Sequence, residues 1–243
     1  MRTFAVGDIH GGLRGLVQLL ERLKITNTDQ LIFLGDYVDG WSESAQVIQY
    51  LIQLSETNDC IFIKGNHDAW CEDWLRTNEG DSIWLAHGGE GAVASYQTFS
   101  EEQKKVHLRF FEAMSLYHID DDKRLFIHAG FTSMHGVEKD YDFRTFYFDR
   151  TLWEMTLTMD KRIAKDSKLY PKRLKHYLEI YIGHTPTTNY FKMHPMNAAN
   201  VWNIDTGAAF SGRLSAIDIN TKAIFQSDIL KDLYPNELGR NKN

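Results

Sequence analysis

Three stretches near the start of the sequence share one pattern: FAVGDIH (residues 4–10), LIFLGDYVD (residues 31–39) and IFIKGNHD (residues 61–68). In each stretch a short apolar run ends in glycine, then Asp or Asn, then further polar side chains. Apolar runs of this length, bounded by glycine, are typical of buried β-strands. A helical pattern follows each run, so we expect parallel strands whose carboxyl ends open onto one edge of a sheet. The sequence therefore predicts an α/β fold.

This sheet edge gathers many polar side chains. The three strand ends would bring together Asp8, His10, Asp36, Asp39, Asn66, His67 and Asp68. Carboxylates that are packed together repel one another, and they are costly to remove from water unless cations neutralise them. A site for two divalent metal ions is the simplest explanation of the pattern.

The composition narrows the class of protein. With 243 residues, 43% of them hydrophobic, the chain has enough apolar material for one large α/β domain, which we expect to span residues 1–243. The net charge of −6 argues against a nucleic-acid partner, because such proteins present a basic face. The cysteines, Cys60 and Cys71, have no metal-binding or disulfide spacing. No apolar run reaches membrane-spanning length and no signal peptide precedes the first strand, so we expect a cytoplasmic protein that contacts no membrane.

The second half of the chain is richer in strand patterns. We expect a hairpin over residues 116–127 and strands near residues 180–182, 201–204, 214–219 and 223–227. These strands should form a β-rich half that packs against the parallel first half. His128 and His184 each follow an apolar strand beside a glycine, so both can reach the same crevice.

This combination of side chains suits phosphoryl chemistry. Carboxylate and amide oxygens mixed with imidazoles fit Mn²⁺, Fe or Zn²⁺ better than Ca²⁺, which prefers oxygen ligands alone. Two such ions roughly 3.5–4 Å apart form the usual clamp for phosphoryl displacement, and they lower the pKa of a bound water to about 7. The resulting hydroxide can attack phosphorus, while a histidine protonates the leaving oxygen.

Five motifs carry a resemblance to a known family. In chain order they are GDIHG (7–11), GDYVDG (35–40), GNHD (65–68), HAG (128–130) and GHTP (183–186). This order resembles metallophosphoesterases of the calcineurin-like superfamily, and most of all the bacterial branch of the phosphoprotein (Ser/Thr) phosphatase family. The resemblance covers residues 3–219, and it implies a β-sandwich of two mixed sheets flanked by helices.

The resemblance also implies a role for each motif residue. The ligands of the first metal would be Asp8, His10 and Asp36. The ligands of the second metal would be Asp36, as a bridge, together with Asn66, His128 and His184. His67 would protonate the leaving oxygen, and Asp39 would orient His67.

The chain departs from the family pattern where the family grips phosphate. Gly40 and Trp41 follow Asp39, at a place where the family usually has Arg, and Met155 occupies the place of a second usual arginine. Arg144 and Arg150 lie nearby in the sequence, and we expect them to bind the substrate instead. An arginine introduced at position 40 would then be expected to lower KM.

Three functions are compatible with this sequence. The leading expectation is a hydrolase of the Ser/Thr phosphoprotein phosphatase type, with a phosphorylated protein as its substrate. The alternative is a hydrolase of dinucleoside polyphosphates or of another small phosphoester. The third is a metal-binding scaffold without turnover, which the missing arginines favour and the intact His67 and Asp39 oppose.

Overall fold

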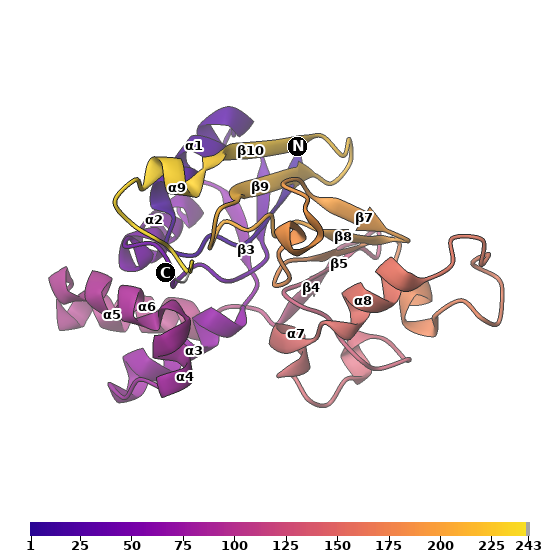
Figure 1. The fold of residues 1–243 in the computed structure, drawn as a ribbon, viewed down its shortest axis with the longest axis horizontal. Helices are drawn as coiled ribbons and strands as arrows, with labels where there is room; N and C mark the ends of the chain where they lie inside the picture. The colour runs from indigo at the N-terminus through magenta and orange to yellow at the C-terminus, as the bar shows by residue number, and fades with distance from the viewer. Residues whose placement is uncertain (242–243) are drawn as a thin grey trace.

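Two five-stranded sheets packed against each other form the centre of the molecule, as the resemblance implies (Figure 1). The computed structural model describes residues 1–241. Ala5, Ile32 and Ile217 of one sheet meet Phe126 and Tyr181 of the other in a fully buried apolar layer. This layer fixes the two sheets relative to each other, and therefore also fixes the loops at their edges.

The first sheet combines strands from both ends of the chain. Its order is β10 (Ile224–Ile229), β9 (Arg213–Asp218), β1 (Thr3–Val6), β2 (Gln30–Phe33) and β3 (Asp59–Phe62). β1, β2 and β3 are parallel, as the sequence predicts. β9 pairs antiparallel with β1, so the prediction that the last two strands belong to the second half is wrong. The fully buried β1 has two edges, and β9 supplies hydrogen-bond partners for the edge that β2 leaves open.

The second sheet is built from the middle of the chain. Its order is β4 (Tyr117–Ile119), β5 (Leu125–Ile127), β6 (Ile180–Ile182), β8 (Val201–Asn203) and β7 (Met196–Ala198). β4 and β5 form the predicted hairpin. β5, β6 and β8 are parallel, so this sheet also presents three strand carboxyl ends at one edge.

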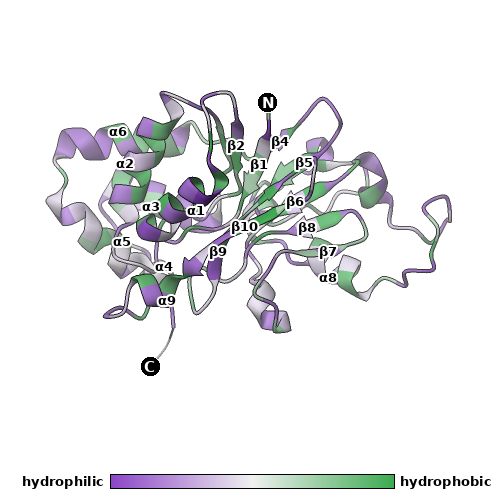
Figure 2. Ribbon diagram, turned by 90° about the horizontal axis from the view of Figure 1, so that it is seen from above, coloured by the Kyte–Doolittle hydropathy of each residue, from purple (hydrophilic) through white to green (hydrophobic). Residues whose placement is uncertain are grey.

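Helices cover the outer faces of both sheets (Figure 2). The first sheet carries α1 (Leu13–Leu23), α2 (Ser44–Ser55), α3 (Asn66–Thr77), α4 (Ser82–Trp84), a π-helix (Leu85–Gly89), α5 (Glu90–Ser95), a 3₁₀ helix (Tyr96–Thr98), α6 (Glu101–Glu112) and α9 (Leu230–Leu233). The second sheet carries α7 (Thr145–Phe148), α8 (Thr151–Thr158) and 3₁₀ helices at Val137–Lys139, Lys172–His176 and Thr187–Tyr190. Among residues 1–241, none of these helices is long and apolar enough to span a membrane.

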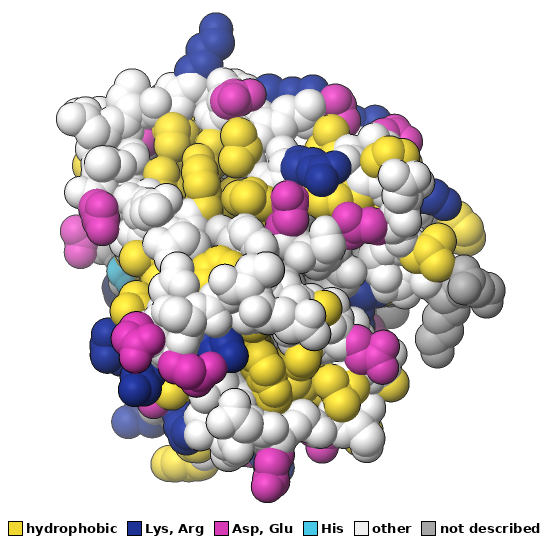
Figure 3. Space-filling view, turned by 90° about the vertical axis from the view of Figure 1, so that its left-hand side faces the viewer, with side chains coloured by type: hydrophobic (Ala, Val, Ile, Leu, Met, Phe, Trp, Pro, Cys, Tyr) yellow, Lys and Arg dark blue, Asp and Glu magenta, His cyan; other side chains and the backbone are white. Residues whose placement is uncertain are grey.

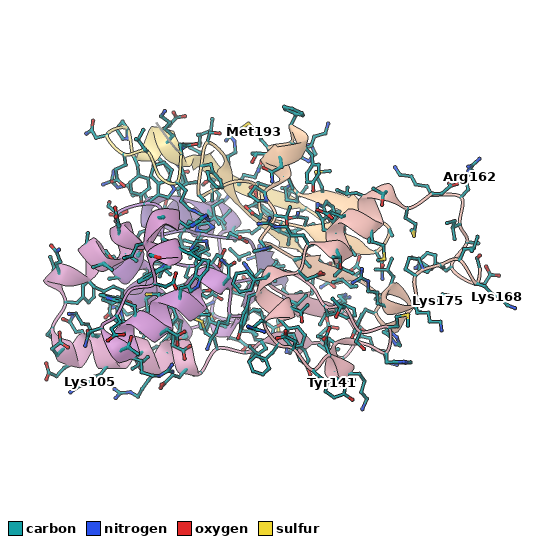
Figure 4. The ribbon with its side chains drawn as sticks, turned by 60° about the horizontal axis from the view of Figure 1, so that its bottom comes forward. Lys105, Tyr141, Arg162, Lys168, Lys175 and Met193 are labelled. Carbon is teal, nitrogen blue, oxygen red and sulfur yellow. The ribbon has the colours of Figure 1, made fainter. Side chains whose placement is uncertain are left out.

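Local sequence signals predict some helix boundaries and miss others. The residue pair Ser100 and Gln103 matches the capping-box pattern, and it starts α6. Ser42 is a residue type that often caps helices, but α2 starts at Ser44, and Ser42 hydrogen-bonds Glu237 instead. The basic stretch 161–175 forms a projecting loop that ends in a short 3₁₀ helix, with Arg162 and Lys168 at its outer edge (Figure 4).

Candidate active site

The predicted site residues lie at the carboxyl ends of the parallel strands of both sheets. Asp8 and His10 follow β1, Asp36 and Asp39 follow β2, Asn66 and His67 begin α3 after β3, His128 follows β5, and His184 follows β6. Because both sheets direct their parallel strands toward the same edge, the loops meet there. Every one of these side chains is at least nine-tenths buried or lines the cavity at this edge.

Asp36 lies at the centre of the cluster. Its Oδ2 lies 3.6 Å from His10 Nε2 and 3.4 Å from His128 Nε2. Two groups of possible ligand atoms share this residue: Asp36 with His10 and His67, and Asp36 with His128 and His184. Within each group the atoms lie within 4.8 Å of one another. One carboxylate is therefore placed between two adjacent sets of ligands.

Asn66 and Asp8 complete these two sets. Asn66 Oδ1 lies 3.0 Å from His184 Nδ1 and 3.3 Å from His128 Nε2. Asp8 Oδ2 lies 3.9 Å from His10 Nε2 and accepts a hydrogen bond of 3.0 Å from the His184 backbone. The other oxygen of Asp8 and His184 Nε2 are buried and have no hydrogen-bond partner among residues 1–241. Such orphaned polar atoms are rare in proteins, and these two are suitable donors to a cation.

Hydrogen bonds to the backbone orient two of the histidines. His10 Nδ1 donates to the Val38 carbonyl at 3.2 Å, and His128 Nδ1 donates to the Leu34 carbonyl at 2.7 Å. Each bond turns Nε2 toward the cluster. Metal-binding histidines commonly have their second nitrogen fixed in this way.

The backbone is strained at the same positions. His10, Asp36, Asp39 and His184 have positive φ values of 53°, 52°, 72° and 68°. Residues other than glycine rarely adopt this backbone conformation. It costs roughly 1–3 kcal/mol at each position and persists mainly at functional sites.

Two glycines make room for the carboxylates. A Cβ atom at Gly65 would clash with the Asp36 carboxylate, and one at Gly183 would clash with the Asp8 carboxylate. Both glycines belong to sequence motifs, GNHD and GHTP. Their lack of a side chain allows the backbone to approach the cluster closely.

His67 is held by a separate pair of contacts. Its Nδ1 lies 2.5 Å from Asp39 Oδ2, and the same oxygen accepts a hydrogen bond of 2.6 Å from Trp84 Nε1. Nδ1 is therefore occupied, and Nε2 is the nitrogen available to the cavity that His67 lines. The sequence singled out His67 and Asp39 but not Trp84, because α4 carries no motif.

Asp68, also expected in the crevice, has a structural position. Its carboxylate accepts hydrogen bonds from the backbone amides of Gly65, Asp36 and Tyr37, at 2.7–2.9 Å. These bonds tie the loop after β2 to the first turn of α3. Asp68 therefore supports the site without facing it.

The electrostatics of the cluster favour added positive charge. Burial, reinforced by the nearby Asp205, raises the pKa of Asp8 well above its usual range, and burial raises the pKa of Asp205 to about 6. Burial works against protonation of His128, yet Asp36 and Asp8 raise its pKa to about 10. Burial lowers the pKa of His67 to about 3. Raised pKa values of packed, buried carboxylates reflect the cost of gathering negative charge there, and a bound cation would offset that cost.

A cavity of about 290 Å³ opens onto the cluster. Arg150 lines this cavity, whereas Arg144 is exposed outside it and pairs with Asp142. Asp205 and Arg240 also line the cavity, and the sequence analysis singled out neither residue. Asp205 directly follows the β8 region, so the strand-end pattern could have identified it. No local pattern marks Arg240.

The chain is similar in sequence to known proteins over most of its length. The family model described as calcineurin-like phosphoesterase matches residues 1–209. A bis(5′-nucleosyl)-tetraphosphatase PrpE (asymmetrical) from Bacillus anthracis is 31% identical over 232 residues, which cover 89% of this chain and 90% of that protein. A protein with the same description from Oceanobacillus iheyensis is 29% identical over 233 residues, which cover 89% of this chain and 88% of that protein.

Solved structures show the same fold at low identity. A candidate diadenosine tetraphosphatase matches with a TM-score of 0.62 and 18% identity, over 93% of this chain and 92% of that one. A protein-tyrosine phosphatase from a psychrophilic Shewanella species matches with a TM-score of 0.55 and 15% identity, over 93% of this chain and 80% of that one. At these identities the comparisons establish the arrangement of strands and helices.

Proposed function

This chain belongs to the calcineurin-like phosphoesterase family and is an enzyme that hydrolyses phosphoesters, and we propose that its substrates are dinucleoside polyphosphates. The observation that carries the proposal is the similarity, at 29–31% identity and nearly full length, to relatives named bis(5′-nucleosyl)-tetraphosphatase. It favours the alternative expectation over the leading one, a Ser/Thr phosphoprotein phosphatase. The scaffold without turnover has no support from these relatives.

We propose that the cluster holds two divalent metal ions, Mn²⁺, Fe or Zn²⁺. The first ion would be held by Asp8, His10 and Asp36, and the second by Asp36, Asn66, His128 and His184. The orphaned atoms of Asp8 and His184 and the mixed oxygen and nitrogen donors fit such ions. When bound, the ions would neutralise phosphate charge and make water acidic enough to act as a nucleophile at neutral pH.

His67 is proposed as the general acid. Asp39 holds its Nδ1 at 2.5 Å, so in the doubly protonated ring the second proton, at Nε2, would point into the cavity toward the leaving oxygen. Burial lowers the pKa of His67, and the negative charge of a bound phosphate would oppose this effect by favouring the protonated ring. Trp84 holds Asp39 in turn, and so fixes the ring of His67. In this proposal Asp39 and Trp84 are positioning residues, and His67 is the residue that touches the substrate.

Arg150 is proposed to bind a substrate phosphate. It lines the cavity, and a guanidinium group forms strong charge-assisted hydrogen bonds to phosphate oxygens. The position of Arg144, outside the cavity and paired with Asp142, gives no such support.

Product analysis tests the proposed function. We expect the Mn²⁺-loaded protein to cleave diadenosine tetraphosphate asymmetrically, giving AMP and ATP in equal amounts by chromatography. The matched control is His67→Asn, which should slow the reaction strongly. ADP as the sole product would contradict asymmetrical cleavage. If the dinucleotide stays intact while a phosphoserine peptide is rapidly dephosphorylated, the protein is instead a Ser/Thr phosphoprotein phosphatase, the leading expectation from the sequence.

A further inference from the structure

A second cavity adjoins the active site. It has a volume of about 480 Å³ and shares Arg240, Phe210 and His87 with the active-site cavity. Glycines contribute much of its wall: Gly40, Gly88, Gly91 and Gly239. Ligand pockets typically measure about 300–1,000 Å³, so the two cavities together can take a ligand much longer than one phosphate group. Arg240 stands where one cavity leads into the other.

The segment that carries Arg240 is fixed to the rest of the molecule. It follows α9 and is drawn in yellow in Figure 1. The Arg240 backbone amide donates to the Ala209 carbonyl at 2.8 Å. The Glu237 carboxylate accepts hydrogen bonds from the backbone and the hydroxyl of Ser42, at 2.9 and 2.7 Å. Arg240 is therefore held beside the loop that follows Asp39.

The side chain of Arg240 occupies space that two glycines leave open. A Cβ atom at Gly40 or at Gly88 would lie 3.3 Å from Arg240 Cγ. Both glycines have a positive φ, 107° and 111°, so any side chain there would be strained as well as crowded. Gly40 is the position at which the arginine of the family motif is missing. The aliphatic stem of Arg240, from the other end of the chain, lies against the place where that side chain would begin, and Arg240 lines both cavities.

The charge of Arg240 is available to a ligand. Its guanidinium makes no ion pair or hydrogen bond with residues 1–241, and its Cζ lies 5.3 Å from the centre of the Phe210 ring. An arginine that lines both cavities and has no partner for its charge among residues 1–241 is suited to bind an anion.

We propose that Arg240 is a substrate-binding residue that holds a non-reacting phosphate of a polyphosphate chain, where the substrate passes from the active-site cavity into the glycine-lined cavity. The inference rests on the proposed function. It explains how the enzyme grips a polyphosphate although positions 40 and 155 carry no arginine. It also assigns the second cavity to the part of the substrate that leaves with the longer phosphate chain.

Steady-state kinetics of Arg240→Ala and Arg240→Lys test the inference. A charge-assisted hydrogen bond to phosphate typically accounts for about 10- to 100-fold in affinity, so KM for diadenosine tetraphosphate should rise by about that factor in Arg240→Ala. The rise for p-nitrophenyl phosphate, which has no second phosphate, should be smaller. Arg240→Lys keeps the positive charge but not the two-pronged contact of a guanidinium group. Its KM for diadenosine tetraphosphate should therefore lie between those of the wild-type protein and Arg240→Ala. Arg162→Ala, on the projecting loop where Arg162 pairs with Asp160, is the matched control.

A binding measurement separates this inference from the proposed function. Calorimetry with the Mg²⁺ complex of tripolyphosphate should show weaker binding to Arg240→Ala than to the wild-type protein. If the wild-type protein does not cleave diadenosine tetraphosphate, the proposed function fails, while this comparison still decides the role of Arg240. Unchanged tripolyphosphate binding, or equal rises in KM for both substrates, would overturn the inference.

Discussion

At the scale of single residues, the account depends on how Asp36 and His67 divide the chemistry. Asp36 belongs to both groups of possible metal ligands, whereas Nδ1 of His67 is engaged by Asp39, which Trp84 holds in turn. A substitution of Asp36 should therefore lower metal content, whereas a substitution of His67 should lower turnover.

Asp36→Asn should lower metal content more than Asp8→Asn, because a bridging ligand serves both ions. The two variants remove the same charge from equally buried positions, so each controls for the other. Elemental analysis of the purified, Mn²⁺-loaded proteins measures the difference. Equal metal content in both variants would show that Asp36 does not bridge.

His67→Asn should retain metal and slow turnover. General acid catalysis typically contributes about 10²–10⁴-fold. The loss should be smaller for a nitrophenyl ester, since nitrophenolate leaves almost without protonation, than for an alkyl phosphoester. Turnover of the two ester classes, with metal content measured alongside, checks this expectation. Loss of metal, or equal losses for both esters, would rule out His67 as the acid.

At the scale of elements, the site depends on loops that are tied to one another. Asp68 joins the loop after β2 to the start of α3 through three backbone amides, and Glu237 joins the last segment to Ser42. The first contact lies within sequence motifs, although the sequence predicted Asp68 for the crevice and not for this tie between loops. The second could not be predicted, because no local pattern tells which loop a distant segment will meet.

Asp68→Ala should destabilise the protein by roughly 3 kcal/mol or more. Each buried amide left without an acceptor costs about 1–3 kcal/mol, and three amides lose theirs. Asp68→Asn, which keeps one carbonyl oxygen as an acceptor, should lose less. Urea denaturation of both variants measures the difference. Equal stability of Asp68→Ala and the wild-type protein would show that these bonds do not hold the loops.

Gly40→Arg should not lower KM, contrary to the expectation from sequence. Gly40 has a φ of 107°, and a side chain there would press against Arg240 Cγ and the His10 carbonyl. We expect a less stable protein with a raised KM, which thermal melting and steady-state kinetics would reveal. A lowered KM would show that the space around position 40 is open.

At the scale of the whole molecule, function arises where two sheets end together. The motif residues could be predicted because a strand followed by Gly-Asp or Gly-His is a local pattern, and parallel strands align their ends by geometry. β9 was misplaced and Arg240 was missed, because both depend on pairing between the two ends of the chain. At the helical end of the molecule, acidic and basic side chains lie scattered around patches of apolar side chains (Figure 3).

The central claim is that this metallophosphoesterase acts on dinucleoside polyphosphates. The most direct test is a competition in which the Mn²⁺-loaded protein meets diadenosine tetraphosphate and a phosphoserine peptide in one reaction, because the ratio of the two rates gives the ratio of kcat/KM values. The account predicts that the dinucleotide is consumed first, with AMP and ATP as products. Preferential release of inorganic phosphate from the peptide would contradict it.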